Sequence, residues 1–303
     1  MFVVPNFEII EFTDPICVWS WGSEPILKKL EISYPHNLKI SYVTGGLIED
    51  IRIFRDDIND IGGDIEKSNK NLAMYYLDAS KVHNMPVCVE NIKIFSKDYY
   101  SSYPANIAYH AVKMQSEKIA NKYLRRLREA HFTEGAQISN PKILVELAKD
   151  VGVKIGDFLQ AFEDGSAENL FQNDLLYTKQ NKIYDFPSFL IRNNFNGKSI
   201  ILRGFQSYNS LKQAIESLAE GEIFEIKIDK SIENILKYLQ DVIKITPMEL
   251  KMIFDMTDQE LNKILKSLKK QGLITLEDVG TSSFIYYIGK ALSCDILTGI
   301  CEF

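Results

Sequence analysis

The sequence predicts an α/β protein in which a long helical block separates two groups of strands, with a small α+β domain after them. Strand-like runs flank a helix between residues 7 and 43, and helical spacing dominates residues 64–182. Strands return at residues 184–203, and the segment after residue 222 has three helical runs followed by two short strands. These observations predict a β-α-β start and a β-β-α end, with the helical block inserted between them.

We therefore expect two domains, residues 1–222 with a helical insertion at about residues 60–182, and residues 223–303. The 303 residues are 46% hydrophobic and 25% charged, which is typical of a globular protein. The net charge of −6 argues against general binding to nucleic acids or membrane surfaces. No apolar run approaches the ~18 residues of a membrane span, and residues 1–5 do not resemble a signal peptide.

The cysteines and histidines are sparse. Four cysteines, Cys17, Cys88, Cys294 and Cys301, do not form a disulfide scaffold in a chain of this length, so a reduced, cytoplasmic location is expected. Cys88 lies between valines and is expected to be buried. The last two cysteines either resolve an adduct of Cys17 or lie in a mobile tail as free thiols. The four histidines lack ligand spacing, and the sequence predicts no metal site.

The stretch from Phe7 to Leu30 carries the strongest chemical signal. Phe7–Phe12 reads as a strand, Thr13-Asp14-Pro15 ends it because proline cannot donate to a ladder, and Cys17 follows at the expected start of a helix. The unpaired amides and positive dipole of a first turn favour a thiolate and lower the thiol pKa. A thiolate attacks disulfides and electrophiles. The spacing alone leaves open a reactive thiol and a small core side chain.

The chain here reads Asp14-Pro15-Ile16-Cys17-Val18-Trp19-Ser20-Trp21-Gly22-Ser23-Glu24-Pro25-Ile26-Leu27. This run resembles the active-site segment of the DsbA-like branch of the thioredoxin superfamily, particularly its cytoplasmic FrnE-like members. There a strand precedes D-P-x-C-x-W-C, an aromatic-Gly pair and x-E-P-x-L. The resemblance extends over roughly residues 7–220 and consists of several separate motifs. It implies a thioredoxin-like fold with Cys17 as nucleophile and Trp19 and Trp21 beside the substrate.

Ser20 replaces the second cysteine of that pattern. It lies one helical turn after Cys17, on the same face. A serine can offer its hydroxyl to the sulfur as a hydrogen-bond donor but cannot resolve a mixed disulfide. One-thiol chemistry therefore remains available, and so does loss of catalysis with retained binding.

Local signals place the other elements of the first domain. Leu38–Val43 alternates with period two and predicts a second, parallel strand, and Pro25 predicts a bend or restart of the first helix. Residues 64–182 read as helical almost throughout, with Asn140 starting one helix and Gly165 ending another. The resemblance implies that this block walls a substrate groove beside Cys17.

The motif Phe186-Pro187-Ser188-Phe189 lies at the start of the second group of strands, expected over Tyr184–Ile191. It looks like the cis-proline loop of the family, which implies a cis Phe186-Pro187 bond facing Cys17. Phe186 and Pro187 are therefore expected to bind substrate together with Trp19. Asn196-Gly197 then predicts a type I′ hairpin, and Ser207 can cap a following helix.

The segment from Ile232 onward resembles a winged-helix domain. Thr246-Pro247-Met248-Glu249 and Thr257-Asp258-Gln259-Glu260 are capping boxes, and Leu273–Leu276 and Phe284–Ile288 predict a strand pair. Five lysines and six acidic residues between Thr246 and Ile288, with no arginine, argue against DNA binding. A protein-interaction module is expected instead.

Three functions remain open from the sequence. The first is a thiol-disulfide oxidoreductase or isomerase that uses a single cysteine, with a protein or small-molecule thiol or disulfide as substrate. The second is a non-catalytic adaptor that holds proteins in the DsbA-like groove and on the C-terminal domain. The third is a kappa-like glutathione transferase or isomerase. No bound cofactor is predicted, although glutathione or another small thiol would serve as co-substrate in the first and third.

Overall fold

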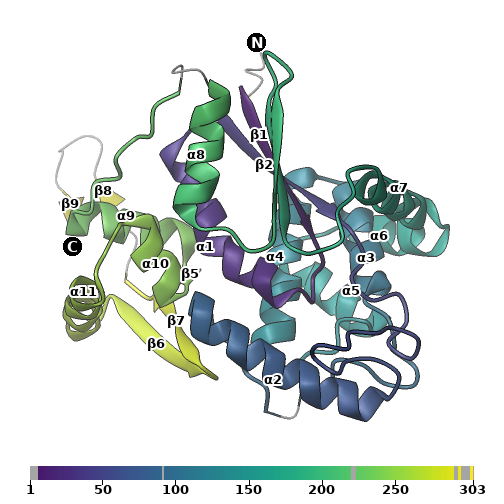
Figure 1. Cartoon of the computed structure of the whole chain (residues 1–303). Coiled ribbons are helices and arrows are strands. Elements are labelled where there is room, and N and C mark those ends of the chain that lie inside the picture. Colours follow the sequence, from purple (N-terminus) through teal and green to yellow (C-terminus); the bar gives the residue numbers. More distant parts are fainter. Residues whose placement is uncertain (1–5, 91, 220–222, 290–292, 295–300, 303) are drawn as a thin grey trace.

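A four-stranded mixed sheet in the order β2-β1-β3-β4 lies at the centre of the N-terminal unit, residues 6–219 (Figure 1). The computed structural model describes residues 6–90, 92–219, 223–289, 293–294 and 301–302. The strands are β1 (Phe7–Thr13), β2 (Leu38–Thr44), β3 (Ser188–Asn193) and β4 (Ser199–Arg203). β1 pairs with β2 in parallel and with β3 antiparallel, and β3 pairs with β4 antiparallel. The predicted thioredoxin-like arrangement is confirmed.

Both faces of this sheet are covered by helices. Helices α1 (Val18–Ser33) and α8 (Tyr208–Ala219) pack on the face that carries Phe7 and Ile9. On the other face Phe12 stacks against Tyr177 of α7 (Ser166–Gln180), with ring centroids 5.7 Å apart. Strands β1 and β3 are accordingly buried at nearly every position, as expected of strands covered on both sides.

The helical block contains α2 (Ile65–His83), α3 (Tyr103–Lys113), α4 (Glu117–Thr133), α5 (Pro141–Asp150), α6 (Ile155–Glu163) and α7. Asn140 caps α5 by accepting from the amide of Lys142, and Gly165 separates α6 from α7 at φ +82°, both as predicted. The prediction of helix almost throughout is wrong for residues 84–102. There the chain runs without a helix in its described part, and Cys88 N donates to Phe132 O of α4 at 2.7 Å.

Helix α1 continues through Pro25 without restarting, so of the predicted bend or restart only the bend stays a prediction. Two local predictions need correction. Strand β3 begins at Ser188, after the proline, rather than at Tyr184. The hairpin after β3 is present, but Gly197 alone of the Asn196-Gly197 pair has positive φ, whereas a type I′ turn needs it at both central residues. Its loop is instead closed by the amide of Gly197, which donates to Asn193 O at 2.9 Å.

The C-terminal unit, residues 223–289, contains α9 (Ile232–Val242), α10 (Pro247–Ile253), α11 (Asp258–Lys270) and the strands β5 (Lys244–Ile245), β6 (Ile274–Val279) and β7 (Ser282–Tyr287). The strands form a sheet in the order β5-β7-β6. Both predicted capping boxes are present, at Thr246 with Glu249 and at Thr257 with Glu260. The three helices followed by a strand pair occur in the expected order. The resemblance to a winged-helix domain and the domain boundary at residue 222 remain predictions.

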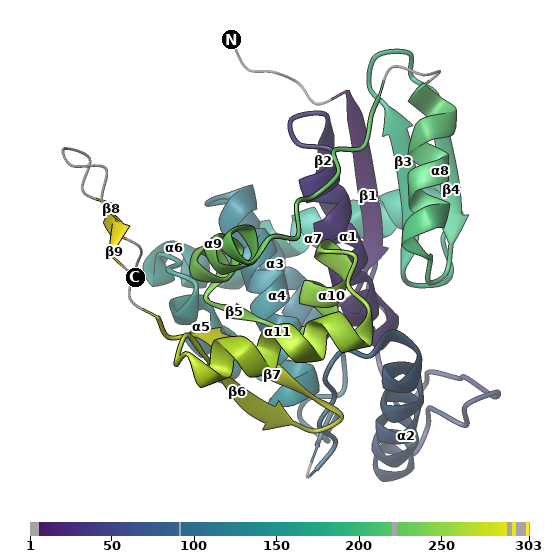
Figure 2. The ribbon, with the colours of Figure 1, turned by 90° about the vertical axis from the view of Figure 1, so that its left-hand side faces the viewer.

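The two units pack directly against each other. Helix α10 lies against α1 (Figure 2). The turn between β6 and β7 contacts the segment after α2, where Thr281 N donates to Val87 O and Val87 N donates to Thr281 Oγ1, each at 3.0 Å. A Cβ on Gly280 would lie 2.0 Å from Val87 O, so only glycine allows this approach. Beyond this unit, β8 (Ser293–Cys294) pairs with β9 (Cys301–Glu302).

Candidate functional site

Cys17 is the N-cap of α1, as the sequence predicted. Its backbone is extended, with φ −77° and ψ 108°, and its sulfur accepts a hydrogen bond from the amide of Ser20 at 3.4 Å. The preceding turn closes through Cys17 N, which donates to Asp14 O at 3.0 Å. The strand, turn and helix therefore bring the thiol to the end of β1 by local interactions alone.

The thiol is buried, with 5% of the residue exposed. Burial raises the pKa of Cys17 to about 11, although hydrogen bonds from Ser20 oppose the increase and the charge of Glu11 adds to it. The predicted lowering of the thiol pKa is therefore wrong. Desolvation disfavours the thiolate by more than the amides of the first turn favour it. At neutral pH Cys17 is a protonated thiol.

Ser20 is buried behind the sulfur. Its amide, rather than its hydroxyl, donates to Cys17, and the hydroxyl oxygen has no hydrogen-bond partner within range in the described residues. The hydroxyl is close enough to lower the pKa of Cys17 and of Glu11 in part. Because this position holds a serine, Cys17 cannot form a disulfide within the first turn of α1.

Trp19 is half-buried at the rim of the site. Its Nε1 donates to the Tyr75 hydroxyl of α2 at 2.6 Å, and its ring centroid lies 5.5 Å from that of Phe205. Trp21 is fully buried, with its Nε1 donating to Pro86 O at 2.9 Å and the Arg125 guanidinium 4.5 Å from its ring. Trp21 therefore packs the core and cannot contact a substrate, contrary to the prediction.

The bond between Phe186 and Pro187 is cis, as the resemblance implied. Phe186 lines a pocket of about 110 Å³ together with Cys17 and Trp19. Pro187 is buried and is not part of that lining. A Cβ on Gly45 would lie 2.2 Å from the Phe186 ring, so glycine at this position makes room for the ring. Three of the four residues expected on one surface thus share a pocket.

Asp14 is a buried part of this site that was not among the site residues predicted from the sequence. Its buried carboxylate accepts from Leu47 N at 2.7 Å, from Ser102 Oγ at 2.8 Å and from Asn106 Nδ2 at 2.8 Å. Burial raises its pKa, and these donors oppose the increase. The carboxylate fixes the turn before Cys17 to α3 and to the segment after β2. An acidic residue beside a proline at the end of a strand was the available signal.

Glu11 of β1, whose charge acts on the pKa of Cys17, was also not among the predicted site residues. Its side chain is buried, and its carboxylate lies 3.3 Å from the guanidinium of Arg128 of α4. Burial raises the pKa of Glu11 to about 7, while the charge of Arg128 lowers it in part. Arg128 also donates to Thr13 Oγ1 at 2.6 Å and forms an ion pair with Glu24. The charges of this buried ion pair act on the thiol in opposite directions, because Glu11 raises the pKa of Cys17 and Arg128 lowers it.

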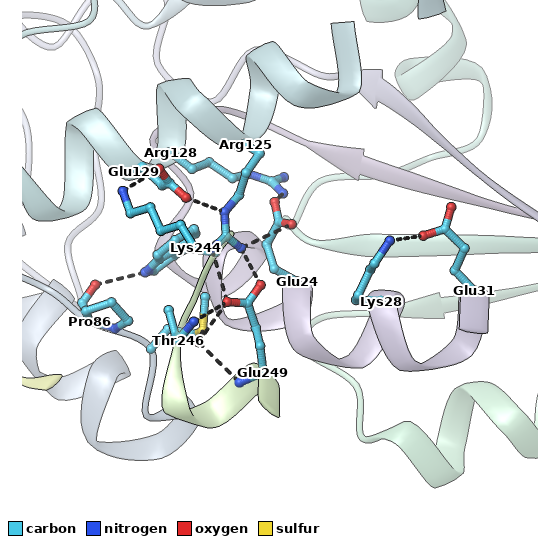
Figure 3. A network of polar contacts seen from close by, with 12 residues as sticks. Glu24, Lys28, Glu31, Pro86, Arg125, Arg128, Glu129, Lys244, Thr246 and Glu249 are labelled. Atoms are coloured by element: carbon cyan, nitrogen blue, oxygen red, sulfur yellow. Dashed lines mark hydrogen bonds and ion pairs between the residues drawn. The ribbon is translucent and has the colours of Figure 1, made fainter. Parts of the chain in front are cut away.

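The ionic network continues from this site into the C-terminal unit (Figure 3). Arg125 lies 3.6 Å from Glu24, 2.9 Å from Glu129 and 2.7 Å from Glu249 of α10. Lys244 of β5 pairs with Glu129 at 2.9 Å. The two units are thus joined by charged groups that are largely withdrawn from solvent.

The other predicted residues lie elsewhere. Cys88 is half-buried rather than buried, in the segment after α2. The side chains of Cys294 and Cys301 lie outside the described residues. Within the described ranges no group of three or more His, Cys, Asp or Glu side chains is arranged to hold a metal ion. No helix in the same ranges is long and apolar enough to cross a membrane.

Comparison with known proteins identifies a matching family and several similar proteins. A family model described as thioredoxin matches residues 11–213. The ClpXP adapter protein SpxH of Halalkalibacterium halodurans is 27% identical over 282 residues, which cover 93% of this chain and 89% of that protein. SpxH of Bacillus subtilis is 21% identical and covers 86% of this chain and 82% of its own length. The similarity to these adapters thus extends beyond the region matched by the family model.

Solved structures share the fold of the N-terminal unit. A Nitrosomonas europaea protein provisionally named a protein disulfide isomerase has a TM-score of 0.60 at 16% identity, covering 71% of this chain and 98% of its own. The cytosolic disulfide reductase DsbM of Pseudomonas aeruginosa has a TM-score of 0.50 at 19% identity, covering 70% and 98%. At these identities the likeness concerns the fold alone.

Proposed function

Since the chain belongs to the thioredoxin family whose model matches residues 11–213, we propose that it uses this fold as a non-catalytic adaptor, presenting a protein substrate to a ClpXP-type protease. The observation that carries the proposal is the burial of Cys17, which keeps the thiol protonated. Disulfide exchange requires a thiolate with access to its target. The SpxH proteins, named as ClpXP adapters, resemble nearly the full length of this chain.

The substitution of serine for the second cysteine supports the same proposal. Ser20 leaves the site without a local resolving thiol. In this proposal the C-terminal unit supplies a second surface for a protein partner, and its ionic contacts to α4 hold it beside the DsbA-like unit. An adaptor needs two surfaces in a fixed relation, whereas a one-thiol enzyme needs only the groove.

One observation favours a second candidate, a single-cysteine oxidoreductase or isomerase. Cys17, Trp19 and Phe186 line one pocket, and a small apolar disulfide or a thiol could approach the sulfur there. The charge of Glu11, whose own pKa is raised to about 7, acts on the pKa of this thiol. This candidate retains the predicted glutathione or similar small thiol as co-substrate.

Two assays on the full chain distinguish these functions. Half-lives of ClpXP substrates are measured in cells with and without the gene, and disulfide reduction of insulin is followed with glutathione, with Cys17→Ser as control. The adaptor proposal predicts longer half-lives for a subset of substrates without the gene, and insulin reduction equal to that of Cys17→Ser. Reduction that clearly exceeds the Cys17→Ser rate would favour the enzyme.

A further inference from the structure

Strand β6 is the outer strand of the three-stranded sheet in the C-terminal unit. Among the described residues, the strand order β5-β7-β6 leaves one edge of β6 without a neighbouring strand, and Figures 1 and 2 show β6 at the periphery. β6 runs over six residues, from Ile274 to Val279, whereas β5 at the opposite edge has two. β6 is therefore the longer open edge of this sheet.

The hydrogen bonds at the start of the strand show which backbone groups point outward. Ile288 N of the chain after β7 donates to Leu273 O at 2.9 Å, so Leu273 faces β7. Because backbone groups alternate along a strand, every second residue after Leu273 also faces β7, and the residues between them direct N–H and C=O to the open edge. The outward residues are Ile274, Leu276 and Asp278. In the part of the chain that the structure describes, none of their backbone groups has a hydrogen-bond partner.

Both ends of β6 are held in place by other parts of the protein. At its start, buried Ile274 belongs to the same apolar cluster as Leu268 of α11. After its end, Thr281 exchanges two hydrogen bonds of 3.0 Å with Val87, and its hydroxyl lies 2.6 Å from that of Ser80 of α2. The strand therefore has its extended shape before any partner binds, and docking on it requires little further ordering of this protein.

We propose that the open edge of β6 binds an extended segment of a partner protein as a fourth strand of this sheet, with a basic side chain of the segment beside Glu277. The inference rests on the proposed adaptor function, because it specifies which surface of the C-terminal unit holds the partner. A row of unpaired N–H and C=O groups is a template for another strand. In such complexes the main chain supplies affinity and the alternating side chains supply specificity.

The two faces of β6 ask for different side chains in the bound segment. Ile274 and Leu276 lie on the face that packs into the apolar cluster, and Leu276 remains partly exposed there. Thr275 and Glu277 are exposed on the other face. Side chains directly across a strand pair contact each other. A segment that alternates apolar and polar residues therefore matches this edge.

The turn end of β6 is negatively charged. Glu277 and Asp278 are both exposed, and Glu277 hydrogen-bonds to the side chain of Tyr286. Neither carboxylate forms an ion pair with a lysine or arginine of the described ranges. Lys269 and Lys270 precede the strand, so the negative charge is confined to its turn end. Because opposite charges across a strand pair are stabilising and like charges are destabilising, a basic residue is favoured beside Glu277.

The test follows amide hydrogen exchange of the full chain by NMR. The probe is the acetylated, amidated heptapeptide Thr-Val-Lys-Val-Lys-Val-Thr, which places valines on one face of a strand and lysines on the other. At saturating peptide, exchange of the Leu276 and Asp278 amides is expected to slow about tenfold or more. The Thr275 and Glu277 amides already bond to β7 and should change little.

Two matched peptides separate main-chain pairing from side-chain contacts. The first carries N-methyl groups on its central valine and on the lysine after it, which blocks both backbone edges, and it should leave the exchange of Leu276 unchanged. The second has glutamates in place of both lysines and should need an about tenfold higher concentration for the same effect. Glu277→Lys should reverse this charge preference, whereas Asp241→Lys, at an exposed position of α9, should preserve it.

A proline on the edge tests the location. Asp278→Pro removes one outward N–H and places a ring on the open edge, while the ladder to β7 keeps its donors. Asp278→Ala removes the same side chain and keeps the N–H. The lysine peptide should bind Asp278→Ala and should fail to slow exchange of Leu276 in Asp278→Pro. Circular dichroism and thermal unfolding verify that both variants are folded, and the N-methylated peptide tests the same point on the native sequence.

Three results would overturn the proposal. One is equal slowing of Leu276 exchange by the N-methylated and unmodified peptides, and another is equal binding to folded Asp278→Pro and Asp278→Ala. The third is slow exchange of Leu276 and Asp278 without peptide that depends on protein concentration, because that result assigns the edge to a second copy of the chain.

The outcome is separable from that of the proposed function. If deleting the gene lengthens the half-lives of ClpXP substrates but the lysine peptide leaves the Leu276 amide unchanged, the adaptor function stands and the edge proposal fails. If the peptide binds as described and the half-lives do not change, β6 binds an extended segment while the link to the protease fails.

Discussion

Arg125 of α4 and Glu249 of α10 form a two-point ion pair between the two units, with Nη1–Oε1 at 2.7 Å and Nη2–Oε2 at 3.1 Å. Glu249 also accepts from Thr246 N at 2.8 Å, so the same carboxylate completes the capping box of α10. The guanidinium lies 4.5 Å from the ring of Trp21, two residues from Trp19. The position of the C-terminal unit is therefore linked to the helix that begins at Cys17.

Removing the carboxylate should destabilise the whole chain. In Glu249→Ala the partly buried Arg125 loses one of its carboxylate partners, and the capping box of α10 loses its glutamate. We expect the free energy of unfolding in urea to fall by about 2–4 kcal/mol. Glu260→Ala, at the exposed capping box of α11, is the matched control and should cost clearly less. Equal losses in the two variants would mean that the ion pair to Arg125 contributes nothing beyond the cap.

Gly22 of α1 provides a test of the contact between α1 and α2. A Cβ at Gly22 would lie 2.5 Å from the buried ring of His83, which packs near Trp19 with ring centroids 6.0 Å apart. Gly22→Ala should lower the free energy of unfolding by about 1–2 kcal/mol, because overpacking outweighs the gain in helix propensity. In Gly156→Ala of α6 the added methyl meets nothing within 4 Å, so that variant should be stabilised by about 0.5–1 kcal/mol. Equal effects of the two substitutions would contradict the tight α1–α2 contact.

The raised pKa of Glu11 predicts a pH dependence of stability. Its pKa is about 7 in the folded protein, against an ordinary value of 4.5, so between these pH values the folded state holds a proton that the unfolded state has released. This contribution to stability is complete below pH 4.5 and is lost as the pH rises toward 7. The stability of the native sequence relative to Glu11→Gln should fall by about 3 kcal/mol over that interval. Unfolding of both proteins in urea at several pH values checks this, and a difference that does not change with pH would contradict it.

The two buried histidines change the pH dependence of stability in the opposite direction. Their effect must therefore be separated from that of Glu11. Burial lowers the pKa of His83 and His131 to about 4, so their contribution to stability rises as the pH increases from 4 to 6.5. Both histidines are present in the native sequence and in Glu11→Gln. The difference between the two proteins therefore isolates the carboxylate.

Local chemistry made part of this site predictable. Cys17 as an N-cap follows from the strand, the proline and the helix start, and the capping box at Thr246 follows from residues three positions apart. The cis bond before Pro187 followed from the family likeness rather than from local preference. In each case the deciding residues are close in sequence or belong to a motif.

The other properties of the site depend on tertiary packing and could not be predicted from local sequence. Trp19 donates a hydrogen bond to Tyr75 of α2, 56 residues away, and α2 thereby covers the site. The residue pattern around Cys17 could not predict this contact. Trp21 reaches Pro86 across 65 residues, and Glu11 reaches Arg128 across 117. The accessibility and the charge state of the thiol depend on these distant partners, and both differ from what the first turn of a helix predicts in isolation.

The ionisation of Cys17 tests the central claim most directly. In a variant that retains Cys17 as its remaining cysteine, made by Cys88→Ser, Cys294→Ser and Cys301→Ser, the rate of alkylation by iodoacetamide is measured from pH 6 to 10, with the same protein unfolded in urea as control. The unfolded control should reach half its maximal rate near the ordinary thiol pKa of about 8.5. The buried thiol should instead react slowly, with a rate still rising at pH 10, as a pKa of about 11 requires. A folded-state midpoint below about pH 8 would contradict the account and show that Cys17 is an activated thiolate.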